Sequence, residues 1–156
     1  MAEFYSRKPT RIPNFDYSSD HYYFITICTQ GMRCFFGYPR KMNIFGEIAE
    51  NDLRKMEHHF GNLELINYVI MPNHIHAIVR IGCDQIAGKR PNLSTVVGLY
   101  KSGVTRKIRE IQPDLTVWQR SFHDHIIRND VQFQKIWEYI ENNPLQWELD
   151  CYYSEN

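Results

Sequence analysis

Two histidines separated by one residue are the first feature of the sequence that could do chemistry. They are His74 and His76, which open the apolar stretch HIHAIVRI. Side chains alternate between the two faces of a strand, so both imidazoles point to one face while Ile75 and Ala77 point to the other. Two imidazoles placed in this way can bind one divalent cation, and without a cation each buried ring needs its own polar partner. The spacing alone leaves a metal site and a pair of ordinary polar side chains as open interpretations.

A second His-x-His pattern occurs at His123 and His125. We interpret His123, which stands close to Phe122 and Trp118, as an imidazole that is packed on aromatic rings or hydrogen-bonded, and we do not expect both pairs to bind one ion. A histidine-triad hydrolase would have a third histidine at the next same-face position of the first pair, where this chain has Ile78. A structural zinc site would have four Cys or His ligands, and no Cys pair with that spacing is present.

The composition is that of one globular domain, which we place at residues 1–156. Hydrophobic residues make up 43% and charged residues 23% of the chain, which is enough apolar material for a core. No apolar run approaches the roughly 18 residues that span a bilayer, and the N-terminus lacks the apolar stretch of a signal peptide. The four cysteines form no C-x-x-C pair, so we expect reduced thiols, a cytoplasmic location and no membrane partner.

The hydrophobic pattern predicts an alternation of strands and helices after an irregular N-terminal arm at residues 1–20. Strands are predicted where β-branched and aromatic residues run together, and helices where apolar residues recur every three to four positions. The predicted strands are 22–29, 63–71, 74–81 and 124–127, and the predicted helices are 45–60, 94–111 and 129–143. Pro72 and Asn73 form the turn of a predicted hairpin, and Ser94 is the predicted N-cap of the middle helix.

This order of elements, β-α-β-β-α-β-α, predicts an α+β fold with a ferredoxin-like antiparallel sheet. In such a fold a split β-α-β repeat builds a four-stranded sheet with helices on one face. The additional C-terminal helix is then expected to cover an edge or the open face of the sheet.

Two motifs together resemble a known family. The stretch 68–76 (YVIMPNHIH) resembles the metal motif of the HUH single-tyrosine transposases, and 137–144 (WEYIENNP) resembles their nucleophile helix. The intervening stretches 93–102 and 117–128 are similar to the REP-associated branch of that family, the REP-associated tyrosine transposases (RAYTs). The likeness covers residues 22–147, and the two motifs with the Trp-Gln-Arg block between them make a specific combination.

The resemblance implies cleavage and rejoining of single-stranded DNA, including hairpin DNA of the REP type, by a tyrosine hydroxyl that attacks a backbone phosphorus. This leaves a 5′-phosphotyrosine and a free 3′ hydroxyl. Tyr139 matches the nucleophile, His74 and His76 match two metal ligands, and Asn143, one helical turn after Tyr139, matches the third. A phenol with a pKa of about 10 is a poor nucleophile unless the phosphate is activated, and Mg²⁺ or Mn²⁺ would provide that activation.

The charge is balanced overall but unevenly distributed. There are 18 Lys and Arg against 18 Asp and Glu, yet residues 89–109 hold six basic residues and no acidic one, whereas 138–155 holds five acidic residues and no basic one. Taken alone, the basic stretch is typical of a solvated helix face. With the resemblance, the basic candidates for contacts to DNA are Arg7, Lys8, Arg11, Lys101, Arg106, Lys107, Arg109, Arg120 and Arg128.

Other interpretations stay open at this point. A replication-initiator-type HUH nickase would share the chemistry. A non-catalytic single-stranded nucleic-acid-binding module or a metal-binding protein without phosphoryl chemistry would share only part of the pattern. Tyr139 lies at the border of the apolar stripe of its helix, so a core position for its ring is also open. The sequence is compatible with a monomer and with a homodimer.

Overall fold

A four-stranded antiparallel sheet forms the centre of the molecule. The computed structural model describes residues 11–82 and 90–155. The strands are β1 (His21–Cys28), β4 (Leu63–Ile70), β5 (His74–Ile81) and β6 (His123–Ile127), in the order β4-β5-β1-β6. Neighbouring strands are antiparallel throughout. This is the strand order of a ferredoxin-like sheet, so the predicted fold class is confirmed.

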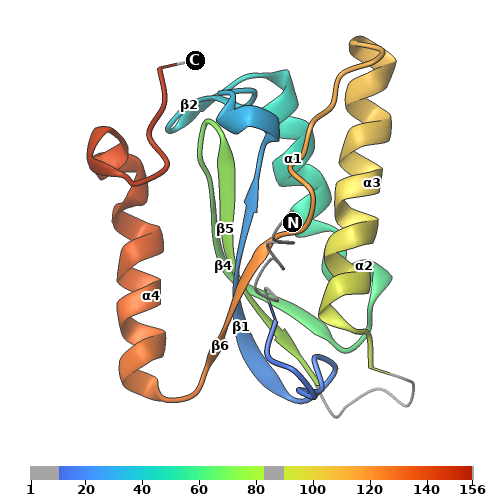
Figure 1. Cartoon of the computed structure of the whole chain (residues 1–156), viewed down its shortest axis with the longest axis vertical. Coiled ribbons are helices and arrows are strands. Elements are labelled where there is room, and N and C mark those ends of the chain that lie inside the picture. Colours follow the sequence, from blue (N-terminus) through green and yellow to red (C-terminus); the bar gives the residue numbers. More distant parts are fainter. Residues whose placement is uncertain (1–10, 83–89, 156) are drawn as a thin grey trace, which may run out of the picture.

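Helices cover both faces of the sheet. They are α1 (Ile44–Arg54), α2 (Met56–His59), α3 (Leu93–Ile111) and α4 (Asp130–Asn142), with the 3₁₀ helices η1 (Gln30–Met32) and η2 (Asn143–Leu149) and the small hairpin β2 (Gly37–Tyr38) and β3 (Lys41–Met42). Figure 1 shows α1 and α3 on one side of the sheet and α4 alone on the other. The additional C-terminal helix therefore covers the open face, which is one of the two positions expected from the sequence. None of the described helices is long and apolar enough to cross a bilayer.

Asparagine side chains begin the three longer helices. Asn43, Asn92 and Asn129 have extended backbones, and each side-chain oxygen accepts a hydrogen bond from a backbone N–H of the first turn. The cap of α3 is thus Asn92 and not the predicted Ser94, because Ser94 already lies inside the helix and donates its backbone N–H to Asn92. The predicted helix 45–60 is interrupted at Lys55, which separates α1 from α2.

The two faces of the sheet bury two separate apolar clusters. The larger one lies under α1 and α3 and includes Ile25, Ile27 and Ile75, all fully buried. The smaller one lies under α4 and is centred on Ile78 and Ile140. Strand alternation sends His74, His76 and Ile78 toward the α4 side and Ile75 toward the other, as the sequence predicted. The histidine pair therefore lies on the same face of the sheet as α4.

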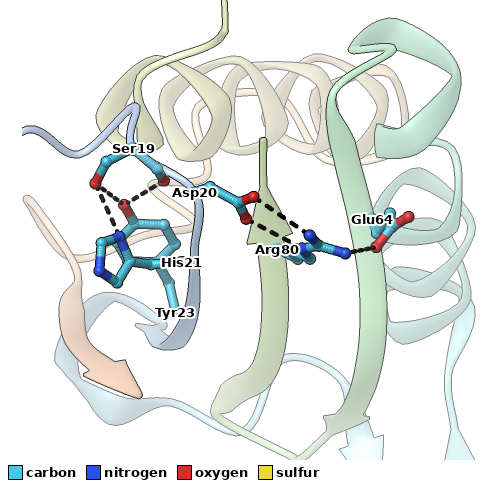
Figure 2. Close-up of polar contacts among 6 residues, drawn as sticks. All are labelled: Ser19, Asp20, His21, Tyr23, Glu64 and Arg80. Atoms are coloured by element: carbon cyan, nitrogen blue, oxygen red, sulfur yellow. Dashed lines mark hydrogen bonds and ion pairs between the residues drawn. The ribbon is translucent and has the colours of Figure 1, made fainter. Parts of the chain in front are cut away.

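A charged cluster (Figure 2) lies where β1 begins and β5 ends, which is the end of the sheet opposite the start of β5 at His74. Arg80 on β5 donates to both carboxylate oxygens of Asp20 at 3.1 and 3.3 Å and lies 3.8 Å from the carboxylate of Glu64 on β4. Directly after β5, Gly82 has a φ of +110°, and a Cβ there would lie 2.7 Å from the Cβ of Asp20. Only glycine fits this close approach, which holds the start of β1 against the end of β5.

Candidate active and metal site

The two imidazoles of the first motif are buried side by side. His74 and His76 are 0% and 1% exposed, and their ring centroids are 4.5 Å apart. Nδ1 of His76 is hydrogen-bonded with the hydroxyl of Thr26 on the neighbouring strand β1 at 2.8 Å. Nδ1 of His74 donates to the side-chain oxygen of Asn73 at 2.8 Å. These outer hydrogen bonds orient both rings and leave Nε2 of each ring for another partner.

The side chain of Asn73 fixes the proton arrangement of His74. Its amide nitrogen donates to the backbone oxygens of Met32 at 3.1 Å and of Tyr152 at 2.7 Å, so its oxygen must be the atom that faces the imidazole. A carbonyl oxygen only accepts, and Nδ1 of His74 therefore carries the proton. The lone pair of this ring lies on Nε2.

Four buried polar atoms without a hydrogen-bond partner among the described residues belong to the same neighbourhood. They are Nε2 of His74, Nε2 of His76, Oδ1 of Asn143 and Oδ2 of Asp150. His74 Nε2 lies 3.9 Å from Asp150 Oδ2, and one ligand atom from each histidine and from Asp150 lies within 4.8 Å of the others. Leaving such atoms unsatisfied costs about 1–3 kcal/mol each. A divalent cation would satisfy them, since neutral imidazole nitrogens and carboxylate and amide oxygens are all metal ligands.

Asp150 is a site residue that the motifs in the sequence did not reveal. It follows η2, and its side chain is only 2% exposed although it lies near the C-terminus. The chain turns sharply after α4 because Pro144 cannot continue the helix, and η2 then carries Asp150 back over the histidine pair. The only sequence signal was the acidic stretch 138–155, which does not single out one carboxylate.

Burial keeps both imidazoles neutral. It lowers the pKa of His74 well below its ordinary value, although the nearby Asp150 carboxylate and the Asn143 amide act in the opposite direction. Burial also lowers the pKa of His76 well below its ordinary value, and the neighbouring His74 lowers it further. A neutral imidazole has a free lone pair, so at neutral pH both rings are in the form that binds a cation.

Tyr139 lies beside the histidine pair of its own chain. It is 40% exposed, and its ring centroid is 5.1 Å from that of His76 and 6.3 Å from that of Phe24 on β1. Partial burial raises the pKa of the Tyr139 hydroxyl, and its contact with the Asn143 side chain lowers it. The structure thus brings together all four residues predicted for catalysis and metal binding, with Tyr139 at the edge of the site and not in the core.

A second tyrosine from the C-terminal segment also packs against the pair. The ring of Tyr152 lies 4.6 Å from that of His74 and 5.8 Å from that of His76, between centroids. Burial raises the pKa of Tyr152 to about 12. The segment that carries Asp150 and Tyr152 therefore forms one wall of the site, and no motif in the sequence indicated this wall.

Several of the predicted DNA-binding residues have partners within the protein. Lys101 donates to the backbone oxygens of residues 119 and 121, Lys107 pairs with Asp52, and Arg109 donates to the backbone oxygen of residue 115. All three side chains extend from α3, which lies across the sheet from α4. Arg11 lies 3.6 Å from the carboxylate of Asp124.

The other predicted DNA-binding residues divide into two groups. Arg106, Arg120 and Arg128 are exposed. Arg7 and Lys8 lie outside the described residues, and so does the first half of the predicted N-terminal arm.

The second His-x-His pair lies on β6 and differs from the expectation. His123 and His125 are both exposed, and within the described part of the chain His123 makes no ring contact and no hydrogen bond. The predicted packing of His123 on aromatic rings is therefore wrong. Its neighbour Phe122 turns into the core, and Trp118 packs there against Phe36 and Tyr100, so the rings expected around His123 face the other way.

Comparisons with known proteins agree with this geometry. The sequence profile of the IS200-like transposases matches residues 17–143. An uncharacterized protein of Haemophilus influenzae is 31% identical over 97% of this chain and 96% of its own length. Together the sheet, the histidine pair and the matched length define a class of DNA transposases, and the chain belongs to the IS200-like transposase family. The family resemblance inferred from the two motifs is therefore confirmed.

Two solved structures share the fold. The structure of a REP-associated tyrosine transposase bound to a REP hairpin has a TM-score of 0.62 at 17% identity, over 87% of this chain and 73% of that one. A Deinococcus radiodurans R1 protein described as a transposase has a TM-score of 0.54 at 17% identity, over 85% of this chain and 97% of that one. The family match ends at residue 143, so Asp150 and Tyr152 lie beyond it.

Proposed function

We propose that this protein cleaves and rejoins single-stranded DNA through a 5′-phosphotyrosine formed on Tyr139. The observation that carries the proposal is the meeting of a half-exposed tyrosine with the buried acceptors of His74, His76 and Asp150. In a chain of the transposase family, this combination supplies a nucleophile and a cation site in one place. The substrate we propose is hairpin DNA with a single-stranded flank.

The reaction we propose is a phosphoryl transfer without net hydrolysis. The hydroxyl oxygen of Tyr139 attacks the backbone phosphorus and the bond to the 3′ oxygen breaks. The phenolic proton passes to water at the exposed edge of the ring, and the leaving 3′ oxygen takes up a proton from water to become a 3′ hydroxyl. Attack by a new 3′ hydroxyl reverses the step and rejoins the strand. Since a phosphodiester is exchanged for another phosphodiester, the transfer is close to balanced in free energy.

The side chains around Tyr139 have distinct proposed roles. His74, His76 and Asp150 hold a divalent cation, with Asn143 as a further oxygen ligand, and Mg²⁺ or Mn²⁺ suits this donor set. When bound, the cation polarises the phosphoryl oxygens and stabilises charge on the leaving 3′ oxygen. Asn143 also contacts the Tyr139 hydroxyl and so aligns the nucleophile with the cation site. A metal ligand and the nucleophile one helical turn apart are held at a fixed distance.

The protein needs no second copy to complete this set. Tyr139 reaches the histidine pair of its own chain, and Asp150 comes from the same chain. We therefore infer that a monomer is sufficient for cleavage. The exposed Arg106, Arg120 and Arg128 are the predicted DNA contacts that are free to meet a phosphate backbone. The cytoplasmic location stays a prediction.

Replacing the nucleophile tests the proposal directly. Labelled hairpin DNA with a single-stranded flank, incubated with the protein and Mn²⁺, should give a covalent adduct that survives denaturation, and Tyr139→Phe should abolish it. Tyr153→Phe is the matched control, because Tyr153 is also 40% exposed and lies in the neighbouring C-terminal segment. DNA retention without any adduct in the unaltered protein would instead identify a non-catalytic binding module.

A further inference from the structure

The edge strand β6 presents an open surface on the face of the sheet that carries the candidate active site. Among the described strands, β6 has only one neighbour in the sheet, β1. Helix α4 packs mainly over β4 and β5 and leaves the start of β6 uncovered. His123 and His125 project from this uncovered part and are both exposed. An exposed strand edge with two imidazoles on one face is a surface that the proposed reaction does not yet use.

The strand register places this surface directly beside the site. Thr26 on β1 is the register partner of His76 on one side and of His123 on the other, so all three side chains lie on one face. Phe24 is likewise paired with His125, and its ring lies 5.2 Å from that of His76 and 6.3 Å from that of Tyr139. The surface is therefore continuous from His125 across Phe24 to the proposed nucleophile.

The chemistry of this surface fits a single nucleic acid strand. Two imidazoles at alternate positions of a strand are roughly 6.6 Å apart, each with ring nitrogens for a phosphate and a flat face for a base. Phe24, the register partner of His125, adds an aromatic ring that lies 5.2 Å from that of His76. The single carboxylate of β6, Asp124, has a side chain that is 2% exposed and lies 3.6 Å from Arg11, so it does not repel a polyanion at the surface. Exposed arginines flank the strand in sequence at Arg120 and Arg128.

We propose that β6 binds the single-stranded DNA next to the cleavage point, with His123 and His125 contacting the strand and Phe24 guiding it to Tyr139. This inference rests on the proposed function, because it assigns a path to the substrate of the same site. It gives the second His-x-His motif a role in DNA binding and not in metal binding.

The experiment compares two DNA probes and two pairs of histidines. One probe is a DNA hairpin with a single-stranded dT extension, and the other is the same hairpin without the extension. The double variant His123→Ala/His125→Ala should bind the extended hairpin about tenfold more weakly than the unaltered protein and the blunt hairpin equally well. His58→Ala/His59→Ala is the matched control, since these histidines are also exposed but lie on α2, across the sheet. It should leave both affinities unchanged.

Photocrosslinking of the unaltered protein provides an independent readout. 5-Iododeoxyuridine in the extension should attach to the tryptic peptide that spans residues 121–128, which contains both histidines. Equal binding of the extended hairpin by the double variant, or crosslinks confined to other peptides, would overturn the inference. Failure of the proposed function looks different: the unaltered protein would then form no adduct on Tyr139, while the histidine variants would still weaken binding of the extended probe.

Discussion

At the scale of single residues, the proposed chemistry depends on acceptors that are buried without hydrogen-bond partners among the described residues. Nε2 of His74 and of His76 and Oδ2 of Asp150 are all removed from water. In the absence of a cation their desolvation opposes folding, and in the proposed site a bound cation would take the same atoms as ligands. The free energy of cation binding is therefore coupled to the stability of the fold around the site.

Removing the carboxylate should weaken cation binding without unfolding the protein. Asp150→Asn keeps the shape of the side chain but loses its charge, and we expect the affinity for Mn²⁺ to fall by at least about tenfold. Isothermal titration calorimetry on the metal-free protein measures this directly. Glu148→Gln, an exposed change in the same segment, serves as the control and should bind Mn²⁺ normally. Normal Mn²⁺ affinity in Asp150→Asn would remove Asp150 from the ligand set.

Acidification should destabilise the metal-free protein. Burial lowers the folded-state pKa of His74 and His76 below the unfolded value near 6.5. Above about pH 6.5 both imidazoles are neutral in the folded and in the unfolded chain, so the free energy of unfolding is not lowered by their protonation. Below that pH the unfolded chain takes up protons that the folded chain does not, so the free energy of unfolding falls by up to about 1.4 kcal/mol per pH unit for each histidine.

Urea unfolding in the presence of a chelator, from about pH 7.5 to about pH 5, measures this slope. His76→Gln should make the slope shallower, because it removes one of the two buried imidazoles. A slope that does not change in His76→Gln would show that His76 titrates equally in both states.

At the scale of elements, backbone geometry decides how the strands are held in register. Gly82 lies at a positive φ against Asp20, at the end of the sheet distant from the site. Gly98, in contrast, lies on an exposed turn of α3, where a Cβ would meet no atom of the described residues within 4 Å. The backbone at residue 82 therefore requires glycine, whereas a larger residue fits at position 98.

These glycines predict opposite changes in stability. Gly82→Ala should lower the free energy of unfolding by more than about 1 kcal/mol, because the new methyl group meets the Asp20 backbone in a conformation that alanine avoids. Gly98→Ala should raise it by about 0.5–1 kcal/mol, since alanine favours a helix interior. Thermal or urea unfolding of the two variants provides the comparison. A stable Gly82→Ala protein would mean that β1 and β5 can separate at this end without loss.

At the scale of the whole molecule, one chain supplies all the residues of the proposed site. Mixing two inactive variants, Tyr139→Phe and His76→Ala, should therefore fail to restore the covalent adduct, because an intact tyrosine and an intact histidine never share one chain. The measurement is the yield of adduct from the mixture compared with each variant alone. Recovery of the adduct would show that α4 supplies Tyr139 to a second copy.

Much of this architecture could be predicted from local sequence patterns. Strand alternation placed His74 and His76 on one face, and helical spacing placed Tyr139 next to Asn143, because both relations depend only on neighbouring residues. The strand order followed from the order of elements, since few topologies accommodate a split β-α-β repeat. These are properties of short segments.

The remainder depends on contacts between distant segments. Asp150 and Tyr152 join the site only because the chain turns after Pro144 and the backbone of Tyr152 accepts a hydrogen bond from Asn73. The exposure of His123 depends on where α4 packs. Neither this exposure nor the position of the C-terminal segment follows from a periodic pattern in the local sequence. The sequence also could not predict that Lys101 donates hydrogen bonds to the loop at residues 119–121, because the acceptors are backbone oxygens, which every residue has.

The hydrogen bonds of Asn73 have a consequence for protein synthesis. Its amide nitrogen donates to the backbone oxygens of residues 32 and 152. Its oxygen therefore faces Nδ1 of His74 and fixes the tautomer of that ring. A nascent polypeptide in which residues 150–152 are not yet made has the histidines but lacks both the Asp150 carboxylate and the hydrogen bond from Asn73 to residue 152. We therefore expect a nascent chain to gain the proposed strand-breaking activity only after the segment that carries Asp150 and Tyr152 has left the ribosome and packed on the histidine pair.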